Sequence, residues 1–545
     1  MPLEVTYFFS VLPFPLFVAL LGSVLLSVGV FLKNIFNMAP TELPGLYYRE
    51  SPLNAHVLAK CKLKERQFSP CPWLGHRHVQ TLLPAILPKP DVTFEREYLQ
   101  MRDKGVVALD WVVCPQAKPK KRRATVLLVL PALTDGALSV TGICHTASGR
   151  GMRVVVFNRR GHGGSVLTTP RLQSFGDPSD LRQVVKYIRQ RLPKAPVAAV
   201  AYGTGCGLLM SYLGEFGSSA LLTVGACISP CYDVPLRFSS AISNLYDLVL
   251  LVRLKTLLFR HAKALSTVLE VDKAVSAWNF SDLDLSLFCP LYGYQDVEQF
   301  WEMNNPIRDV DDIEVPLLCI NSLDDPTCQC ADIPFDLFKC YPNFLLAVTS
   351  KGGHCGFLEG FPPKSWADSL CLDYAEAVVE FTAKSTQQQQ QQQQKEQQQL
   401  QVKVNESSAA ALMAEDAPLS PHSGRGPASP TSRKRSSSTA GQPAEPTDPV
   451  VQPSPTKRIP TGGSSSANAT EPAPSSSIHI GGPDICTESF KSYRVRGNIR
   501  SSSESDTTDE LSSGDESLSD PSSETSSNHS PCGEYMDLSV DRSIS

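Results

Sequence analysis

The sequence predicts an α/β protein built on a doubly wound, mostly parallel sheet, and two observations carry this prediction. Between about residues 70 and 383, short apolar runs alternate with amphipathic segments, as they do when strands and covering helices take turns along a chain. This region of roughly 300 residues is a comfortable size for one domain with a large core. The strand-like runs lie at 125–130, 153–157, 196–202, 221–228, 316–321 and 344–349.

The N-terminal segment 6–32 contains no charged residue. Roughly 20 apolar residues suffice for a helix that spans a bilayer, so residues 1–33 are predicted to be a membrane anchor. The expected location is a membrane, crossed once, in the endoplasmic reticulum or another internal compartment. A cleaved signal peptide is the alternative and would give a secreted protein, because the small residues 27–29 offer a cleavage point.

The C-terminal segment 384–545 is rich in Gln, Ser and Pro and begins with an uninterrupted glutamine run at 387–394. Such a composition cannot bury enough apolar surface to fold, so we predict a disordered tail. Serine-rich basic and acidic stretches at 433–438 and 503–516, and a tyrosine motif at 534–538, predict phosphorylation there. The tail is also where protein partners are expected.

Charge and cysteine usage exclude several classes of function. The net charge is −5, and the sequence has no basic face of the kind that binds nucleic acid, so nucleic-acid binding is not expected. The 16 cysteines include no C-x-x-C pair, so zinc spacing is absent and neither a metal nor another cofactor is expected. Cysteines inside apolar runs, such as Cys227 and Cys319, are typical of small buried side chains in a reducing compartment.

Three motifs follow predicted strands, at the edge where an open α/β sheet gathers its functional groups. The run 196–202 leads into Gly-Thr-Gly-Cys-Gly at 203–207, where a G-x-S-x-G nucleophile elbow would stand, with Gly205 in place of the serine. The acidic pair Asp324-Asp325 follows the run 316–321, and His354 lies among glycines after the run 344–349. Turn, acid and histidine come in the chain order of the α/β-hydrolase triad.

The chemistry of such a triad assigns a role to each member. The acid orients the imidazole and offsets its charge, the imidazole removes a proton, and a serine or cysteine attacks the carbonyl. We therefore predict Asp325 as the acid, His354 as the base and Gly205 as the lost nucleophile position. Cys206 is the candidate substitute, although a side chain just after the elbow tip points down the helix, which favours a buried role for it.

Several segments together resemble the membrane-anchored α/β-hydrolase domain (ABHD) family of lipid esterases and phospholipases. The resemblance covers about residues 60–383 and rests on the segments 73–82, 154–164, 169–172 and 175–181, continued by 321–326 and 353–357. It implies an α/β-hydrolase fold and a lipid or acyl-ester ligand at a membrane. It also places the oxyanion donors at Leu133 and Cys206, in a loop 131–136 that has lost a glycine of the family pattern and gained Asp135.

The Leu-rich, aromatic stretch at about 232–306 interrupts the strand rhythm and is predicted to be a helical cap, either a lid over the site or helices packed on the sheet. The functional prediction is a non-catalytic or degenerate lipid hydrolase that acts as a lipid-binding, regulatory or scaffold protein. The alternative is an active lipid carboxylesterase, acylglycerol lipase or phospholipase.

Overall fold

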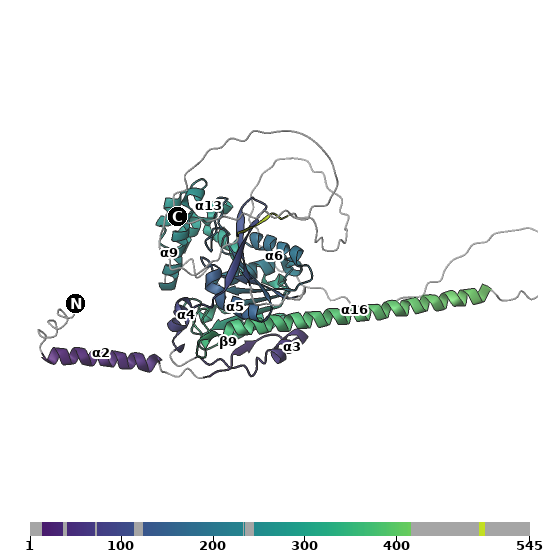
Figure 1. The fold of residues 1–545 in the computed structure, drawn as a ribbon, viewed down its shortest axis with the longest axis horizontal. Coiled ribbons are helices and arrows are strands. Elements are labelled where there is room, and N and C mark those ends of the chain that lie inside the picture. Colours follow the sequence, from purple (N-terminus) through teal and green to yellow (C-terminus); the bar gives the residue numbers. More distant parts are fainter. Residues whose placement is uncertain are drawn as a thin grey trace, which may run out of the picture. The chain divides into compact units, whose positions relative to one another are not determined.

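The computed structural model describes residues 14–35, 41–70, 74–113, 124–232, 234, 245–415 and 490–495. Its main sheet has ten strands, and those from β5 to β9 in sheet order are parallel. Figure 1 shows this sheet among the helices that cover it. All six predicted runs are among these parallel strands, so the predicted fold class is confirmed. The strand order is β1 (Gly45–Tyr47), β9 (Phe344–Thr349), β8 (Leu317–Ser322), β7 (Val224–Ile228), β6 (Val197–Tyr202), β4 (Val126–Leu130), β5 (Arg153–Asn158), β3 (Val106–Val113), β2 (Thr93–Gln100) and β12 (Ser492–Val495).

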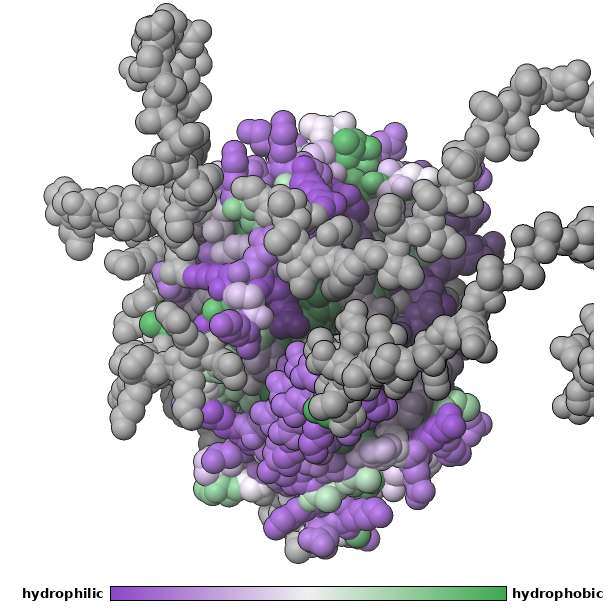
Figure 2. Space-filling view, turned by 90° about the vertical axis from the view of Figure 1, so that its right-hand side faces the viewer, coloured by the Kyte–Doolittle hydropathy of each residue, from purple (hydrophilic) through white to green (hydrophobic). Residues whose placement is uncertain are grey.

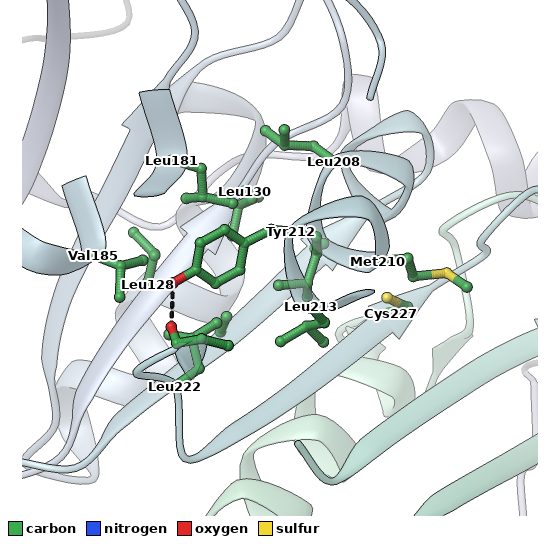
Figure 3. Close-up of a cluster of buried hydrophobic side chains, with 14 of the residues drawn as sticks. Leu128, Leu130, Leu181, Val185, Leu208, Met210, Tyr212, Leu213, Leu222 and Cys227 are labelled. Atoms are coloured by element: carbon green, nitrogen blue, oxygen red, sulfur yellow. Dashed lines mark hydrogen bonds between the residues drawn. The ribbon is translucent and has the colours of Figure 1, made fainter. Parts of the chain in front are cut away.

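Helices pack on both faces of this sheet and enclose two cores. Side chains of β4 alternate between them: Leu128 and Leu130 enter one core, Leu127 and Val129 the other. Figure 3 shows the first of these cores, where Tyr212 packs among leucines and its hydroxyl donates to the Ala220 carbonyl. The first core is covered by α6 (Ser179–Arg191), α7 (Thr204–Phe216) and α15 (Phe335–Cys340), and the second by α3 (Pro52–Lys60), α5 (Thr141–Gly149) and the start of α16 (Trp366–Glu415).

A third core belongs to the helices between β7 and β8, in the predicted cap region. These helices pack on one another and on Leu133, Leu172 and Phe175 of the loops at the sheet edge. The cap therefore rests directly on the predicted oxyanion loop. Its helices are α9 (Leu245–Arg260), α10 (Ala262–Leu265), α11 (Val271–Ser276), α12 (Phe280–Ser286), α13 (Phe288–Tyr292) and α14 (Val297–Asn304).

The far edge of the sheet is antiparallel and contains a strand from the predicted tail. β2 and β3 form a hairpin, and β12 pairs with β2 so that Ser492 lies opposite Leu99. The Gln100 N–H donates to the Lys491 carbonyl at 3.0 Å, and the Phe490 ring lies 5.8 Å from that of Tyr187. Residues 490–495 thus complete the sheet although they lie far beyond residue 384.

The single-pass membrane prediction is wrong. Within the part of the chain that the structure describes, no helix is long and apolar enough to cross a membrane. Helix α2 (Phe14–Ile35) begins eight residues into the apolar segment 6–32, and its side chains are described only from Val18 to Val30 and at Lys33. A spanning helix needs roughly 20 apolar residues.

The last long helix, α16, continues through the glutamine run to Glu415, so it extends beyond the predicted start of the tail at residue 384. Glutamine has favourable helix propensity, and the helix is already formed where Trp366 and Leu370 anchor it to the core. The predicted phosphorylation segments at 433–438, 503–516 and 534–538 lie outside the described residues.

The described surface agrees with this division into core and exterior. On the side drawn in Figure 2 the uncovered surface is mostly hydrophilic, with hydrophobic residues in small separate patches.

The remaining short elements are α4 (Arg77–Ile86), whose Thr81 reaches the candidate site, and the two-stranded pair β10 (Leu358–Glu359) and β11 (Lys364–Ser365).

Candidate functional site

The turn between β6 and α7 has the strained backbone of a nucleophile elbow, and its central residue is Gly203. This glycine has φ 49° and ψ −119°, angles that residues with a side chain rarely adopt. A methyl carbon placed on Gly203 would lie 2.9 Å from His354 Nε2 and 3.6 Å from Cys355 Sγ. The turn therefore presents Gly203, which has no side chain, to the imidazole.

Gly205, the predicted nucleophile position, does not face the histidine. It lies within α7, where a methyl carbon would come within 2.6 Å of the Pro131 carbonyl oxygen and 2.7 Å of that of Leu130. The close approach of α7 to the end of β4 is what requires a glycine here. The five residues 201–205 form the turn, two positions earlier than the spacing of the glycines alone predicts.

The predicted acid and base are brought together. His354 Nδ1 lies 2.8 Å from Asp325 Oδ2, and Asp325 Oδ1 accepts the N–H groups of Thr327 and Cys328 at 2.7 and 3.0 Å. Burial opposes ionisation of Asp325, but the histidine and these donors outweigh it and lower the pKa of the carboxyl. The neighbouring Asp324 instead accepts the Gly353 N–H at 2.9 Å.

His354 is held for proton transfer through its other nitrogen. Its backbone N–H donates to Thr81 Oγ1 at 2.9 Å, and its Nδ1–H is directed at Asp325, which leaves Nε2 toward Gly203. Burial lowers the pKa of His354, but the negative charge of Asp325 outweighs it and holds that pKa well above its usual value, with a further contribution from Cys355. The pair has the arrangement of a general base and its orienting acid.

The predicted oxyanion donors are already engaged. The Leu133 N–H donates to Thr204 Oγ1 at 2.6 Å, and the Cys206 N–H donates to the Gly203 carbonyl at 3.0 Å. Asp135 in the same loop forms an ion pair with Arg253 of α9, and the distance from Asp135 Oδ1 to Arg253 Nη2 is 2.5 Å. A developing oxyanion would have to displace a side-chain hydroxyl from Leu133.

Cys206 is fully buried and points away from the histidine. Its thiol donates to the carbonyls of Ala201 and Ile228 at 3.3 and 3.4 Å, and burial raises the pKa of the thiol to about 11. A protonated thiol under the sheet cannot act as a nucleophile toward an ester at the turn.

Among the described residues, Asp325, Cys328 and His354 form a group in which one ligand atom from each lies within 4.8 Å of the others. Two of these atoms, Asp325 Oδ2 and His354 Nδ1, already share a hydrogen bond, and Thr327 Oγ1 lies 2.6 Å from the same nitrogen. The arrangement suits proton sharing between acid and base better than a bound metal ion.

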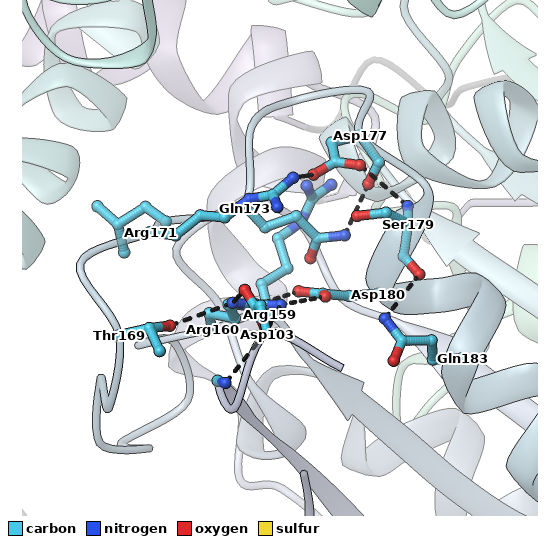
Figure 4. Close-up of polar contacts among 12 residues, drawn as sticks. Asp103, Arg159, Arg160, Thr169, Arg171, Gln173, Asp177, Ser179, Asp180 and Gln183 are labelled. Atoms are coloured by element: carbon cyan, nitrogen blue, oxygen red, sulfur yellow. Dashed lines mark hydrogen bonds and ion pairs between the residues drawn. The ribbon is translucent and has the colours of Figure 1, made fainter. Parts of the chain in front are cut away.

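A buried polar network fixes the loop that supports the cap (Figure 4). Arg160 binds both carboxylate oxygens of Asp180 at 2.6 Å and also pairs with Asp103. The loop then binds the cap, because Asn304 Oδ1 accepts the Ser174 hydroxyl at 2.6 Å. A bidentate guanidinium–carboxylate pair is geometrically specific, so it fixes the position of the loop. Through the Ser174–Asn304 bond, the loop in turn fixes the position of the cap.

The cap and sheet leave little free space at this contact. The cavity between them measures about 10 Å³, room for roughly one water molecule. It is lined by Leu133, His162, Leu172, Gln173, Leu254, Leu257, Leu258, Leu287 and Phe288.

Comparisons with known proteins find relatives in the ABHD family, although no family model matches the chain. The human "Protein ABHD15" is 40% identical over 341 residues, which cover 60% of this chain and 73% of that protein. The bovine "Phospholipase ABHD3" is 30% identical (59% and 80% covered), and the zebrafish (Danio rerio) "Monoacylglycerol lipase ABHD2" is 24% identical (66% and 89%). Among solved structures, a putative aryl esterase from Burkholderia cenocepacia is 13% identical with a TM-score of 0.36, covering 52% of this chain and 99% of that one.

Proposed function

The chain belongs to the ABHD family of hydrolase-fold proteins, and from that premise we propose that it is a non-catalytic lipid hydrolase relative. It keeps the acid and the base of the triad and lacks the nucleophile. Its role is to bind a lipid or acyl-ester ligand in lipid metabolism, as a regulatory or scaffold protein.

One observation carries this proposal: the residue opposite His354 Nε2 is Gly203. The hydroxyl or thiol of an elbow nucleophile would be attached at this place, and glycine has nothing there to attack with. Removing the nucleophile of a serine protease costs roughly a million-fold in turnover, so the acid–base pair cannot make up the loss.

The occupied oxyanion donor supports the same conclusion. A donor of this kind accelerates ester cleavage only if it is free to bind the charge that develops in the transition state. Here the Leu133 N–H already has the Thr204 hydroxyl as its acceptor, 2.6 Å away. The site is thus incomplete in both the attacking and the stabilising group.

The ligand class comes from the relatives. The relatives named as a phospholipase and a monoacylglycerol lipase have names that denote lipid-ester hydrolysis, and they align with 59% and 66% of this chain. We propose that the site retains the ability to accept such an ester. Binding of protein partners through the tail, residues 384–545, is a prediction from its composition.

The test compares two glycine variants of the full chain. The wild type should not react with a fluorophosphonate probe, and Gly203→Ser should gain labelling that a further His354→Ala substitution removes. Gly205→Ser is the matched control, because its Cβ would clash with two backbone oxygens; it should unfold at a lower temperature and stay unlabelled.

His354-dependent labelling of the wild type at a residue of the turn 201–205 would contradict the proposal, since it would require an elbow nucleophile where Gly203 has no side chain. Stronger labelling of Gly205→Ser than of Gly203→Ser would contradict the assignment of the turn.

A further inference from the structure

A thiol from the histidine loop reaches the place that Gly203 leaves empty. Cys355 follows His354 directly, and its Sγ lies 3.6 Å from the point where a side chain on Gly203 would begin. Its backbone N–H donates to Ser229 Oγ at 2.9 Å, and its φ of 59° is unusual for a residue with a side chain. The loop therefore holds the thiol against the elbow turn.

Its surroundings differ from those of the other cysteines that the structure describes, nine of which are buried. Cys355 is half-buried, its thiol donates to the Ile228 carbonyl at 3.6 Å, and it directly follows His354, whose imidazole is bound to Asp325. A half-buried thiol next to the turn, one residue from an imidazole that an acid orients, is a setting in which a cysteine can act as a nucleophile, with the imidazole as its proton acceptor when neutral or as the counter-ion of the thiolate when protonated. Cys340 is exposed and offers an unassisted thiol for comparison.

We infer that Cys355 is a nucleophilic thiol that accepts an acyl group from an ester at the Gly203 turn, with His354 and Asp325 as its base and acid. The inference rests on the proposed function for the ligand class, a lipid or acyl ester. The nucleophile thus comes from the histidine loop instead of the elbow.

The reaction balances with groups that are present. His354 Nε2 takes the proton of the thiol, and the sulfur attacks the carbonyl carbon of the ester. The new bond is Sγ–C and the broken bond is the ester C–O, and the departing alkoxide takes the proton from His354. The products are an acylated Cys355 and a free alcohol.

The acyl group is expected to stay on the protein. Acylation and hydrolysis both pass through an oxyanion that the Leu133 N–H, bonded to Thr204, does not stabilise. Acylation can still proceed because the thiol sulfur is a much stronger nucleophile than the water on which hydrolysis depends. Cys355 therefore acts once per molecule, as an acyl acceptor, in contrast to a nucleophile that turns over.

The experiment treats the purified full chain with p-nitrophenyl octanoate. We expect a burst of one p-nitrophenolate per chain without further turnover, an octanoyl group on the peptide that contains Cys355, and its release by neutral hydroxylamine. Cys355→Ala should abolish the burst, and Cys340→Ala, which changes an exposed cysteine outside the site, should retain it. His354→Asn should slow the burst by roughly 10²-fold or more, because it removes the base.

Two controls keep the outcome decisive. Cys355→Gly suits the positive φ and should also lose the burst while its melting temperature stays at or above that of the wild type. Octanoyl transfer, followed by mass spectrometry of the digested chain, should be faster at Cys355 than at the exposed Cys340.

A burst that persists in Cys355→Ala, or octanoyl transfer to Cys340 as fast as to Cys355, would overturn the inference. These failures are distinct from failure of the proposed function. Gly203→Ser would still gain fluorophosphonate labelling if only the Cys355 inference were wrong, whereas continuous turnover by the wild type would count against the proposed function itself.

Discussion

The Thr204 hydroxyl offers the sharpest test of the proposal that the Leu133 N–H is not free to act as an oxyanion donor. It accepts the Leu133 N–H at 2.6 Å and so holds the one predicted loop donor that points toward the turn. In a Gly203→Ser background, replacing Thr204 by Ala removes this acceptor and frees the N–H for a developing oxyanion. Thr204→Ser in the same background keeps a hydroxyl and is the matched control.

The expected size of the effect follows from the number of donors released, which is one. A single oxyanion donor contributes about 10²–10³-fold in rate, or about 2.7–4 kcal/mol of transition-state stabilisation. We therefore expect Gly203→Ser/Thr204→Ala to react with a fluorophosphonate about 10²-fold faster than Gly203→Ser. Gly203→Ser/Thr204→Ser should react at the rate of the single variant.

The measurement is the second-order rate constant of labelling, taken on variants whose melting temperatures show that they fold. Equal rate constants for the Thr204→Ala and Thr204→Ser forms would refute the reasoning, because the hydroxyl would then not be what occupies the Leu133 donor.

Two further predictions concern stability and the tail strand. Burial raises the pKa of Asp368 to about 6, so the folded state holds a proton that the unfolded chain releases near pH 4, and wild-type stability should fall as pH rises between these values. In Asp368→Asn this fall should disappear from a plot of melting temperature against pH; a parallel curve would contradict the assignment. Ser492→Asp places a carboxylate near buried Glu97, because the Tyr187 hydroxyl contacts both side chains, and the repulsion should weaken the pairing of β12 with β2. The measurement is hydrogen exchange at the Gln100 amide, which donates to Lys491 and should exchange faster in the variant. Tyr493→Ala changes an exposed side chain of the same strand and should leave that rate unchanged.

The parallel centre of the sheet could be predicted because its strands are buried on both faces and appear in the sequence as unbroken apolar runs. The hairpin of β2 and β3 has no such run, since residues such as Glu95 and Arg96 lie between apolar ones at the sheet edge. The strand β12 is harder still to predict from the sequence. A strand in a serine-rich segment is specified by the partner that it meets, here β2 and the ring of Tyr187, and not by its own composition.

The candidate site divides in the same way. Asp325 and His354 could be assigned from their places after two strands, and the geometry brings them within 2.8 Å of each other. The turn could not be aligned by the spacing of glycines. Gly203 and Gly207 match both outer glycines of a G-x-S-x-G pattern, whereas the turn that the structure shows, 201–205, begins with Ala201. The end of the apolar run at Tyr202 was the available signal, since an elbow follows its strand directly.

The retained acid–base pair does not by itself argue for catalysis, because the fold uses the same atoms to hold its loops. Asp325 accepts two backbone N–H groups of the turn that follows it, and the His354 N–H is fixed by Thr81 of α4. These bonds would be kept in a protein that never cleaves an ester. Cys355 lies against the same turn and makes one weak structural bond, from its thiol to the Ile228 carbonyl at 3.6 Å, so it is the residue at which structural need and chemical use can be separated by experiment.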